Sequence, residues 1–133
     1  MSQDNVELVR KLFGVYNERS FAEHPDLVDP NVVWDMSRVD LPDALSYTGR
    51  SEFRHFVEAW DEGFASEQME AREMVDAGDR VVVVVRHRGQ GRRSGIELEE
   101  TFAMVWTLRD GRATRMEMYP TRKEALEAVG LSE

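Results

Sequence analysis

The chain has 133 residues, which is enough for one domain with its own hydrophobic core. It contains no cysteine, so disulfides, a thiolate metal site and a cysteine nucleophile are excluded. The net charge is −9, from 17 Lys and Arg against 26 Asp and Glu, and so acidic a surface repels nucleic acid and anionic membranes. The sequence has no apolar run of about 18 residues and no signal-peptide order at its start, which favours a cytoplasmic protein.

The first half of the sequence predicts two helices with one strand between them. In chain order, we expect a helix over residues 5–19, a helical turn over 21–28, a strand over 32–36, a loop over 37–50 and a long helix capped by Ser51. In the first helix, apolar residues recur at helical spacing behind a capping box formed by Asp4 and Glu7.

From Glu67 onward the spacing of apolar residues changes to two, which predicts strands. We expect, in order, a strand ending at the Gly78-Asp79 turn, a strand over 81–85, a flexible connection over 89–95, a strand over 96–108, a hairpin turn at Asp110-Gly111, a strand to Tyr119, and a helix capped by Thr121 and stopped by Gly130. Helices packed beside an antiparallel sheet make an α+β domain, and we expect residues 1–133 to form a single one.

Three local strings carry a resemblance to a known superfamily. They are Asp29-Pro30-Asn31-Val32-Val33-Trp34, Tyr47-Thr48-Gly49-Arg50-Ser51, and the segment from Val105 through Asp110-Gly111 to Ala128. With the order of elements, they make the chain resemble the nuclear transport factor 2-like superfamily, in particular its SnoaL-like branch. The resemblance implies a cone, in which a curved mixed or antiparallel sheet wraps a long N-terminal helix, with two further short helices and a short C-terminal helix. It also implies an apolar cavity.

Members of this superfamily include ketosteroid isomerase, polyketide cyclases, scytalone dehydratase and non-catalytic proteins, so activity must be argued from the site. Asp35 ends the first strand on the face of Val33, where the resemblance implies the isomerase's general base, and apolar surroundings would raise its pKa. Tyr16 lies in the region that supplies that enzyme's oxyanion-hole tyrosine. The alternatives are a loop-capping Asp and a core Tyr. The isomerase's second hydrogen-bond donor falls here on Met104 or Ala103, and neither can donate.

Two ionisable residues interrupt apolar strand faces. His87 continues the apolar face of the strand at 81–85, and Glu100 lies within the apolar face of the strand at 96–108. Buried ionisable groups need partners, so the two could pair across neighbouring strands as an acid–base dyad. The alternative is a bulge or strand end that returns both to water. Glu73 interrupts its strand face in the same way, which indicates a bulge or an edge.

Large apolar residues are candidates for the walls of a ligand cavity, although they could equally be plain core. With Glu100, the predicted ligand-binding residues are Phe56, Trp60, Phe102, Met104, Trp106 and Met118. The three histidines have no metal-ligand spacing, so we expect no metal and no cofactor.

The sequence thus predicts a small-molecule-binding protein with an apolar cavity. One form is a cofactor-independent isomerase, cyclase or dehydratase acting on a hydrophobic carbonyl substrate, with Asp35, Tyr16 and His87 as catalytic residues. The alternatives are a non-catalytic carrier or sensor, and a dimeric interaction module. Because the strand at 81–85 is apolar on both faces and one helix layer covers only one of them, we expect a homodimer through the other face.

Overall fold

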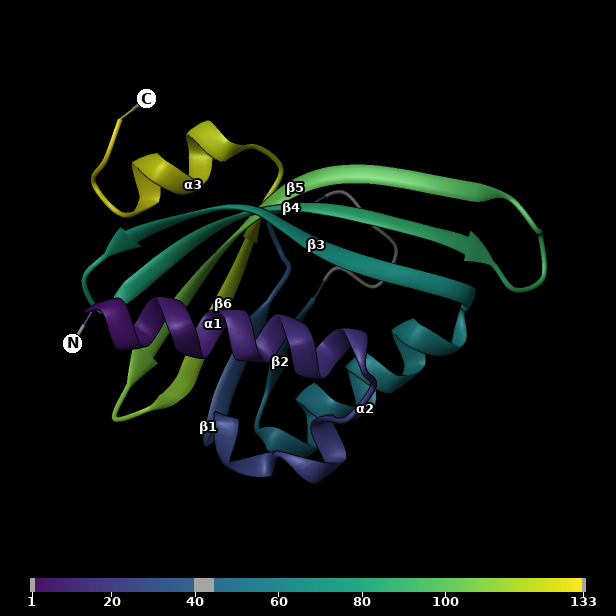
Figure 1. Cartoon of the computed structure of the whole chain (residues 1–133), viewed down its shortest axis with the longest axis horizontal. Helices are drawn as coiled ribbons and strands as arrows, with labels where there is room; N and C mark the ends of the chain where they lie inside the picture. Colours follow the sequence, from purple (N-terminus) through teal and green to yellow (C-terminus); the bar gives the residue numbers. More distant parts are fainter. Residues whose placement is uncertain (1, 40–44, 133) are drawn as a thin grey trace.

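The computed structural model describes residues 2–39 and 45–132. Within these residues the elements are α1 (Ser2–Asn17), the 3₁₀ turns η1 (Phe21–Glu23) and η2 (Pro25–Leu27), β1 (Val28–Asp35), β2 (Ser46–Thr48), α2 (Arg50–Glu62), β3 (Phe64–Ala77), β4 (Arg80–Gly91), β5 (Glu97–Arg109), β6 (Arg112–Tyr119) and α3 (Arg122–Ala128). The described strands form one curved sheet in the order β2-β1-β6-β5-β4-β3 (Figure 1). Only the β1–β6 pair is parallel among these described strands. The predicted α+β class with a curved mixed sheet is confirmed.

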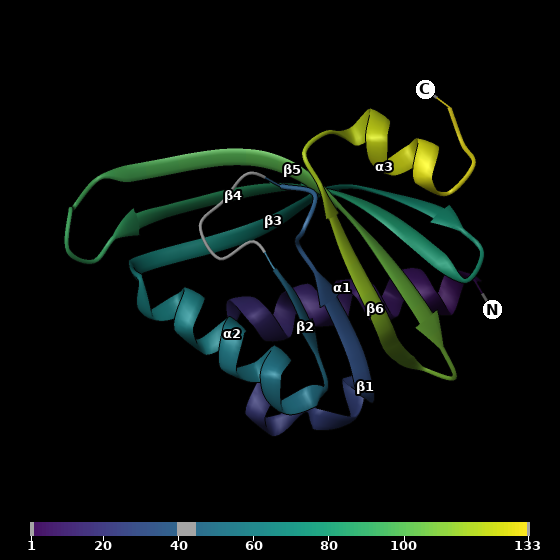
Figure 2. The same ribbon diagram turned by 180° about the vertical axis from the view of Figure 1, so that it is seen from behind.

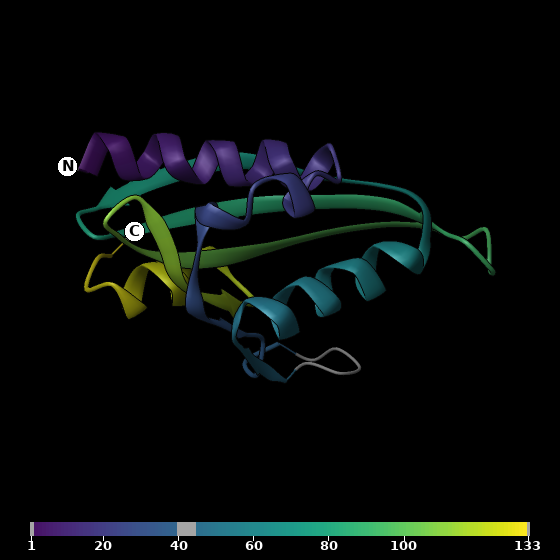
Figure 3. The same cartoon turned by 90° about the horizontal axis from the view of Figure 1, so that it is seen from below.

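The helices lie on both faces of the sheet. Figure 3 shows α1 (purple) and α3 (yellow) on opposite sides of the strands, and Figure 2, seen from behind, shows α3 nearer the viewer than α1. We call the face that packs against α1 and α2 the inner face, and the face under α3 the outer face. No helix within residues 2–39 and 45–132 is both long and apolar enough to span a membrane.

The main core fills the space between the inner face and the two long helices. Val9, Leu12 and Phe13 of α1 are buried there because they fall on one stripe of the helix. Alternate residues of each strand face them, such as Val83 of β4 and Met104 of β5. This alternation decides which polar side chains enter the core.

A smaller core lies on the outer face beneath α3. Ala125 and Leu126 of α3 cover Val82, Val105 and Tyr119 of the strands. The predicted cap of this helix is present, since Thr121 Oγ1 accepts a hydrogen bond from the Glu124 backbone N–H at 3.2 Å. The C-terminal helix therefore covers Val82, one of the two outward valines of the strand at 81–85 that we expected a second copy to cover. The other, Val84, is half-buried and lies outside this cluster.

Several element boundaries differ from those predicted. The first helix begins at Ser2, so Asp4 lies in its first turn and does not cap it. The second helix begins one residue before Ser51, after Gly49, whose φ of 96° is one that glycine adopts without strain. Of the predicted loop, residues 40–44 lie outside the described residues, and Ser46–Thr48 form a strand. A register shift between Ala71 and Glu73 places the predicted bulge on β3, at the sheet edge.

We predict that the substitution Leu126→Ala lowers the free energy of unfolding by about 2–4 kcal/mol, because Leu126 is 3% exposed and its loss leaves a cavity under α3. Urea denaturation measures this change. The control is Leu131→Ala, at a side chain that is 39% exposed, which should change the stability by less than about 0.5 kcal/mol. Equal effects of both variants would contradict the packing of α3 on the sheet.

Candidate functional site

An apolar pocket lies where α2 packs against the inner face of the sheet. Its lining residues are Tyr16, Trp34, Met36, Phe56, Val57, Trp60, Met69, Glu100, Phe102 and Met118. The space inside it is about 20 Å³, which is enough for a water molecule. Among the lining residues that the structure describes, Glu100 alone carries a carboxylate. We call this space the α2 pocket.

A hydrogen-bonded cluster of ionisable side chains lies directly behind Glu100. The His87 side chain is fully buried, with its Nε2 atom 2.8 Å from Glu67 Oε1 and its Nδ1 atom 3.7 Å from Glu100 Oε1. The Tyr16 hydroxyl donates a hydrogen bond to the same Glu67 oxygen at 2.8 Å. The Glu67 side chain is 1% exposed, whereas that of Glu100 is 36% exposed. Glu100 therefore connects the buried cluster to the pocket.

The strand register brings this cluster together. His87 of β4 pairs with Glu100 of β5 and with Met69 of β3, so all three side chains lie on the inner face. His87 and Glu100 are the cross-strand neighbours that the strand pattern predicted. Glu67 precedes Met69 by two residues and therefore shares its face.

Sequence reasoning did not identify Glu67 as a site residue. Its signal was available, because the alternation through Met69 and Ala71 extends back to Glu67 on the same face. The residue was counted only as the start of the strand. The contacts of Glu67 with His87 of β4 and with Tyr16 of α1 depend on the tertiary structure.

The pKa of Glu67 lies below its ordinary value, whereas the pKa values of Tyr16 and Asp61 lie above theirs. Burial raises the pKa of Glu67, but hydrogen bonds from His87, Asp61 and Tyr16 outweigh it, so this pKa lies below its ordinary value. Burial raises the pKa of Tyr16, and the charge of Glu67 and the hydrogen bond to it raise it further. Burial, and next a hydrogen bond with Glu67, raise the pKa of Asp61, which also pairs with Arg19 at 3.0 Å. Glu67 is thus a carboxylate and Tyr16 a neutral hydrogen-bond donor.

Three buried nitrogen atoms around the pocket have no hydrogen-bond partner among residues 2–39 and 45–132. They are His87 Nδ1 and the indole nitrogens of Trp34 and Trp60. The imidazole ring lies among aromatic rings, with its centroid 5.8 Å from that of Trp60 and 5.1 Å from that of Phe64. Most buried donors in folded proteins are paired, so unpaired ones beside a pocket indicate groups available to a ligand.

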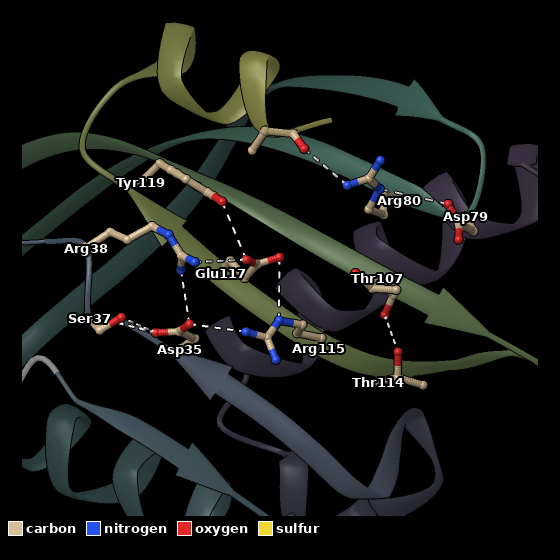
Figure 4. A network of polar contacts seen from close by, with 11 residues as sticks. Asp35, Ser37, Arg38, Asp79, Arg80, Thr107, Thr114, Arg115, Glu117 and Tyr119 are labelled. Atoms are coloured by element: carbon tan, nitrogen blue, oxygen red, sulfur yellow. Dashed lines mark hydrogen bonds and ion pairs between the residues drawn. The ribbon is translucent and has the colours of Figure 1, made fainter. Parts of the chain in front are cut away.

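Asp35 lies on the other face of the sheet, which corrects its expected place in the cavity (Figure 4). Trp34 and Met36 belong to the main core, so Asp35 between them points to the outer face. Its carboxylate accepts hydrogen bonds from the Ser37 hydroxyl at 2.6 Å, from Arg38 at 3.0 Å and from Arg115 at 3.2 Å. The predicted base is thus separated from Tyr16 by the sheet.

The surroundings of Asp35 also reverse the expected shift of its pKa. Burial raises the pKa of this carboxyl group, but the hydrogen bonds from Ser37 and Arg38 and the charge of Arg38 outweigh it, so the pKa lies below its ordinary value. Both arginines also reach Glu117, at 3.4 Å from Arg38 and 3.5 Å from Arg115. Such a network stabilises the carboxylate and disfavours its use as a base.

Of the predicted ligand-binding residues, five line the α2 pocket and two do not. Phe56, Trp60, Glu100, Phe102 and Met118 line it. Met104 and Trp106 are 1% and 3% exposed and belong to the main core without lining the pocket. Within the described residues, no group of three His, Asp or Glu side chains is arranged to hold a metal ion.

The chain belongs to the SnoaL-like domain family, whose model matches residues 9–116. No curated protein sequence matches it. A nuclear transport factor 2-like protein of unknown function from Burkholderia pseudomallei is 21% identical, with a TM-score of 0.75 over 95% of this chain and 97% of that one. A protein proposed to be a SnoaL-like polyketide cyclase from Jannaschia sp. is 20% identical, with a TM-score of 0.76 over 88% and 85%.

A third solved structure is a protein with a ketosteroid isomerase-like fold from Catenulispora acidiphila, in complex with trimethylamine. It is 15% identical, with a TM-score of 0.75 over 94% of this chain and 93% of that one. At these identities the likeness establishes the fold and leaves the activity to the site.

We predict that the substitution Asp35→Asn destabilises the protein by about 1–2 kcal/mol at neutral pH, because it weakens charged hydrogen bonds. Since the folded-state pKa lies below the ordinary value of 3.8, the stabilisation is present above that value and is lost as the pH falls through the folded-state pKa. Urea denaturation at several pH values measures both effects. The control is Asp26→Asn, at an exposed residue. A stability difference that persists unchanged in acid would contradict this account.

Proposed function

We propose that the chain binds a small hydrophobic carbonyl compound in the α2 pocket and catalyses a proton transfer on it without a cofactor, as an isomerase, cyclase or dehydratase does. The observation that carries the proposal is a fully buried imidazole between two carboxylates, one of which lines an apolar pocket. Buried ionisable groups are costly, and their concentration at a pocket favours a catalytic role.

In this proposal Glu100 is the general base. Its carboxylate takes a proton from the carbon next to the carbonyl group, and the electron pair of that C–H bond moves onto the carbonyl oxygen as an enolate. In a substrate with a carbon–carbon double bond one carbon further from the carbonyl group, the enolate is conjugated with that bond. Glu100 then returns the proton to the far carbon of the double bond, the electron pair on oxygen re-forms the carbonyl group, and the product is the conjugated isomer. His87 lies 3.7 Å behind Glu100 and can hold the proton, since the Glu67 carboxylate on Nε2 stabilises an imidazolium.

The unpaired indole N–H groups of Trp34 and Trp60 are candidate donors to the enolate oxygen. The Tyr16 hydroxyl, the donor predicted from the resemblance, already donates to Glu67. We therefore assign Tyr16 to holding the Glu67 carboxylate, which in turn orients His87.

A ligand larger than water must widen the α2 pocket. Phe56 and Trp60 form its wall on α2, and both are half-buried. Movement of these side chains would admit the ligand and change the surroundings of two of the three tryptophans, Trp34 and Trp60. Tryptophan fluorescence is therefore a direct measure of binding.

The alternative is a non-catalytic carrier or sensor that uses the same pocket. The apolar lining of the pocket suits binding without chemistry equally well. The similar solved structures support both the enzyme and the carrier. One is described as a proposed polyketide cyclase, and another is in complex with trimethylamine. The two functions differ in the need for Glu100.

We predict that the protein accelerates hydrogen–deuterium exchange next to the carbonyl group of 2-tetralone, and that Glu100→Gln lowers this acceleration by about 100-fold or more. Binding, measured by tryptophan fluorescence, should be retained because the change is isosteric. Nuclear magnetic resonance in D₂O measures the exchange, with tetralin as the analogue that lacks the carbonyl group.

The matched control is Glu99→Gln, because Glu99 pairs with Arg86 and its strand position places it on the outer face. This variant should behave like the wild type. Binding of 2-tetralone with no accelerated exchange would favour the carrier, and no binding of either compound would contradict the proposal.

We also predict a homodimer, although α3 covers Val82, one of the two outward valines on which that expectation first rested. Ile96 and Leu98, near the β4–β5 turn, are 59% and 44% exposed and would be covered by a second copy. Light scattering at micromolar concentration should give twice the chain mass, and the double substitution of both residues by Ser should lower it. A monomer mass for the wild type would refute the dimer.

A further inference from the structure

Half of the residues that line the α2 pocket are aromatic. Trp34, Phe56, Trp60 and Phe102 line it, and we call these four residues the aromatic wall. The ring centroids of Phe56 lie 6.1 Å from those of both Trp34 and Trp60, so the rings follow one another along the pocket. The faces of aromatic rings carry negative potential and attract a cation within about 6 Å.

The charges around the pocket have the same sign as these ring faces. Among residues 2–39 and 45–132, no Lys, Arg or His lines the pocket, and Glu100 does. Behind it, the lowered pKa of Glu67 keeps a second carboxylate charged. Within the described part of the chain, His87 is the one cationic candidate in contact with both, and even as an imidazolium it carries one positive charge against two carboxylates. Arg19 is paired with Asp61, the residue whose carboxyl group also contacts Glu67.

The remaining lining suits a compact, methylated head group. Met36, Met69 and Met118 line the pocket beside the aromatic wall. Their thioether side chains are flexible and polarisable, so they adapt to a rounded apolar cation. A carboxylate or phosphate would instead meet Glu100 without a compensating positive charge, and its entry is disfavoured.

We infer that the α2 pocket selects a ligand with a positively charged organic ammonium group, which the aromatic wall and Glu100 bind together, over neutral and anionic ligands of the same shape. The inference rests on the proposed function, because it specifies the ligand class of the same pocket. In a substrate of this class the ammonium group lies close to the carbonyl-bearing part.

The test compares three soluble probes of nearly the same shape. Choline carries a trimethylammonium group, 3,3-dimethyl-1-butanol replaces its nitrogen by carbon, and 3,3-dimethylbutyrate carries a carboxylate. Choline should bind at least about 10-fold more tightly than the neutral alcohol, as an aromatic and carboxylate site permits, and the carboxylate should bind most weakly. Tryptophan fluorescence and calorimetry measure the three affinities.

Two variants separate the contributions. Glu100→Gln should lower choline affinity about 5-fold or more while leaving that of the neutral alcohol unchanged, because only the charge is removed. Trp60→Leu should weaken choline more than the alcohol, because it removes an aromatic face and keeps an apolar side chain. Glu99→Gln, outside the pocket, should alter neither affinity.

The outcomes distinguish this inference from the proposed function. Equal or tighter binding of the neutral alcohol, together with binding of 2-tetralone, would overturn the cation preference and leave the proposed function standing. Failure of all the probes and of 2-tetralone to bind would overturn both. Cation preference that survives Glu100→Gln unchanged would overturn the assigned role of that carboxylate.

Discussion

His87 is fully buried, and the rest of the inner site depends on how its polar atoms are satisfied. The Glu67 carboxylate accepts one hydrogen bond from Nε2 of His87 and another from the Tyr16 hydroxyl. This one carboxylate of β3 therefore links α1 to β4. Removing charges from water is costly unless partners replace the water, and here the partners come from three elements. The cluster therefore requires the packing of α1 on the sheet. The one carboxylate that reaches outward from it, Glu100, makes the same cluster available to a ligand.

The sheet separates two sets of ionisable groups that perform different tasks. On the inner face, carboxylates and an imidazole lie beside an apolar pocket that no arginine of the described residues lines. On the outer face, Asp35 and Glu117 are neutralised by Arg38 and Arg115 (Figure 4). The outer network stabilises charges that are already matched, whereas the inner one leaves an excess of negative charge beside aromatic rings. In the proposed function, this excess of negative charge is the feature that recognises a ligand.

Because the α2 pocket is narrow, binding of a ligand there would require its lining side chains to move. Its space of about 20 Å³ holds little more than water, yet its walls are formed by side chains of α2 and by methionines. A closed apolar site excludes water, which strengthens every electrostatic interaction inside it. A narrow pocket hinders the entry of a ligand into the free protein. Once a ligand is bound, the same narrowness would assist proton transfer in an enzyme, or retention of the ligand in a carrier.

The sequence by itself determined the class of fold and the candidates on β4 and β5. Local periodicity distinguishes helices from strands, and His87 and Glu100 were identified as polar residues on apolar faces. It did not determine the side of Asp35, because strand side chains alternate with a period of two and the curvature of β1 decides which set, Val33 and Asp35 or Trp34 and Met36, faces the core. Nor did it join Glu67 to Tyr16, 51 residues apart in the chain. Only the tertiary structure decided these points, because the face a strand presents and the partners it meets are set by pairing and packing between distant segments.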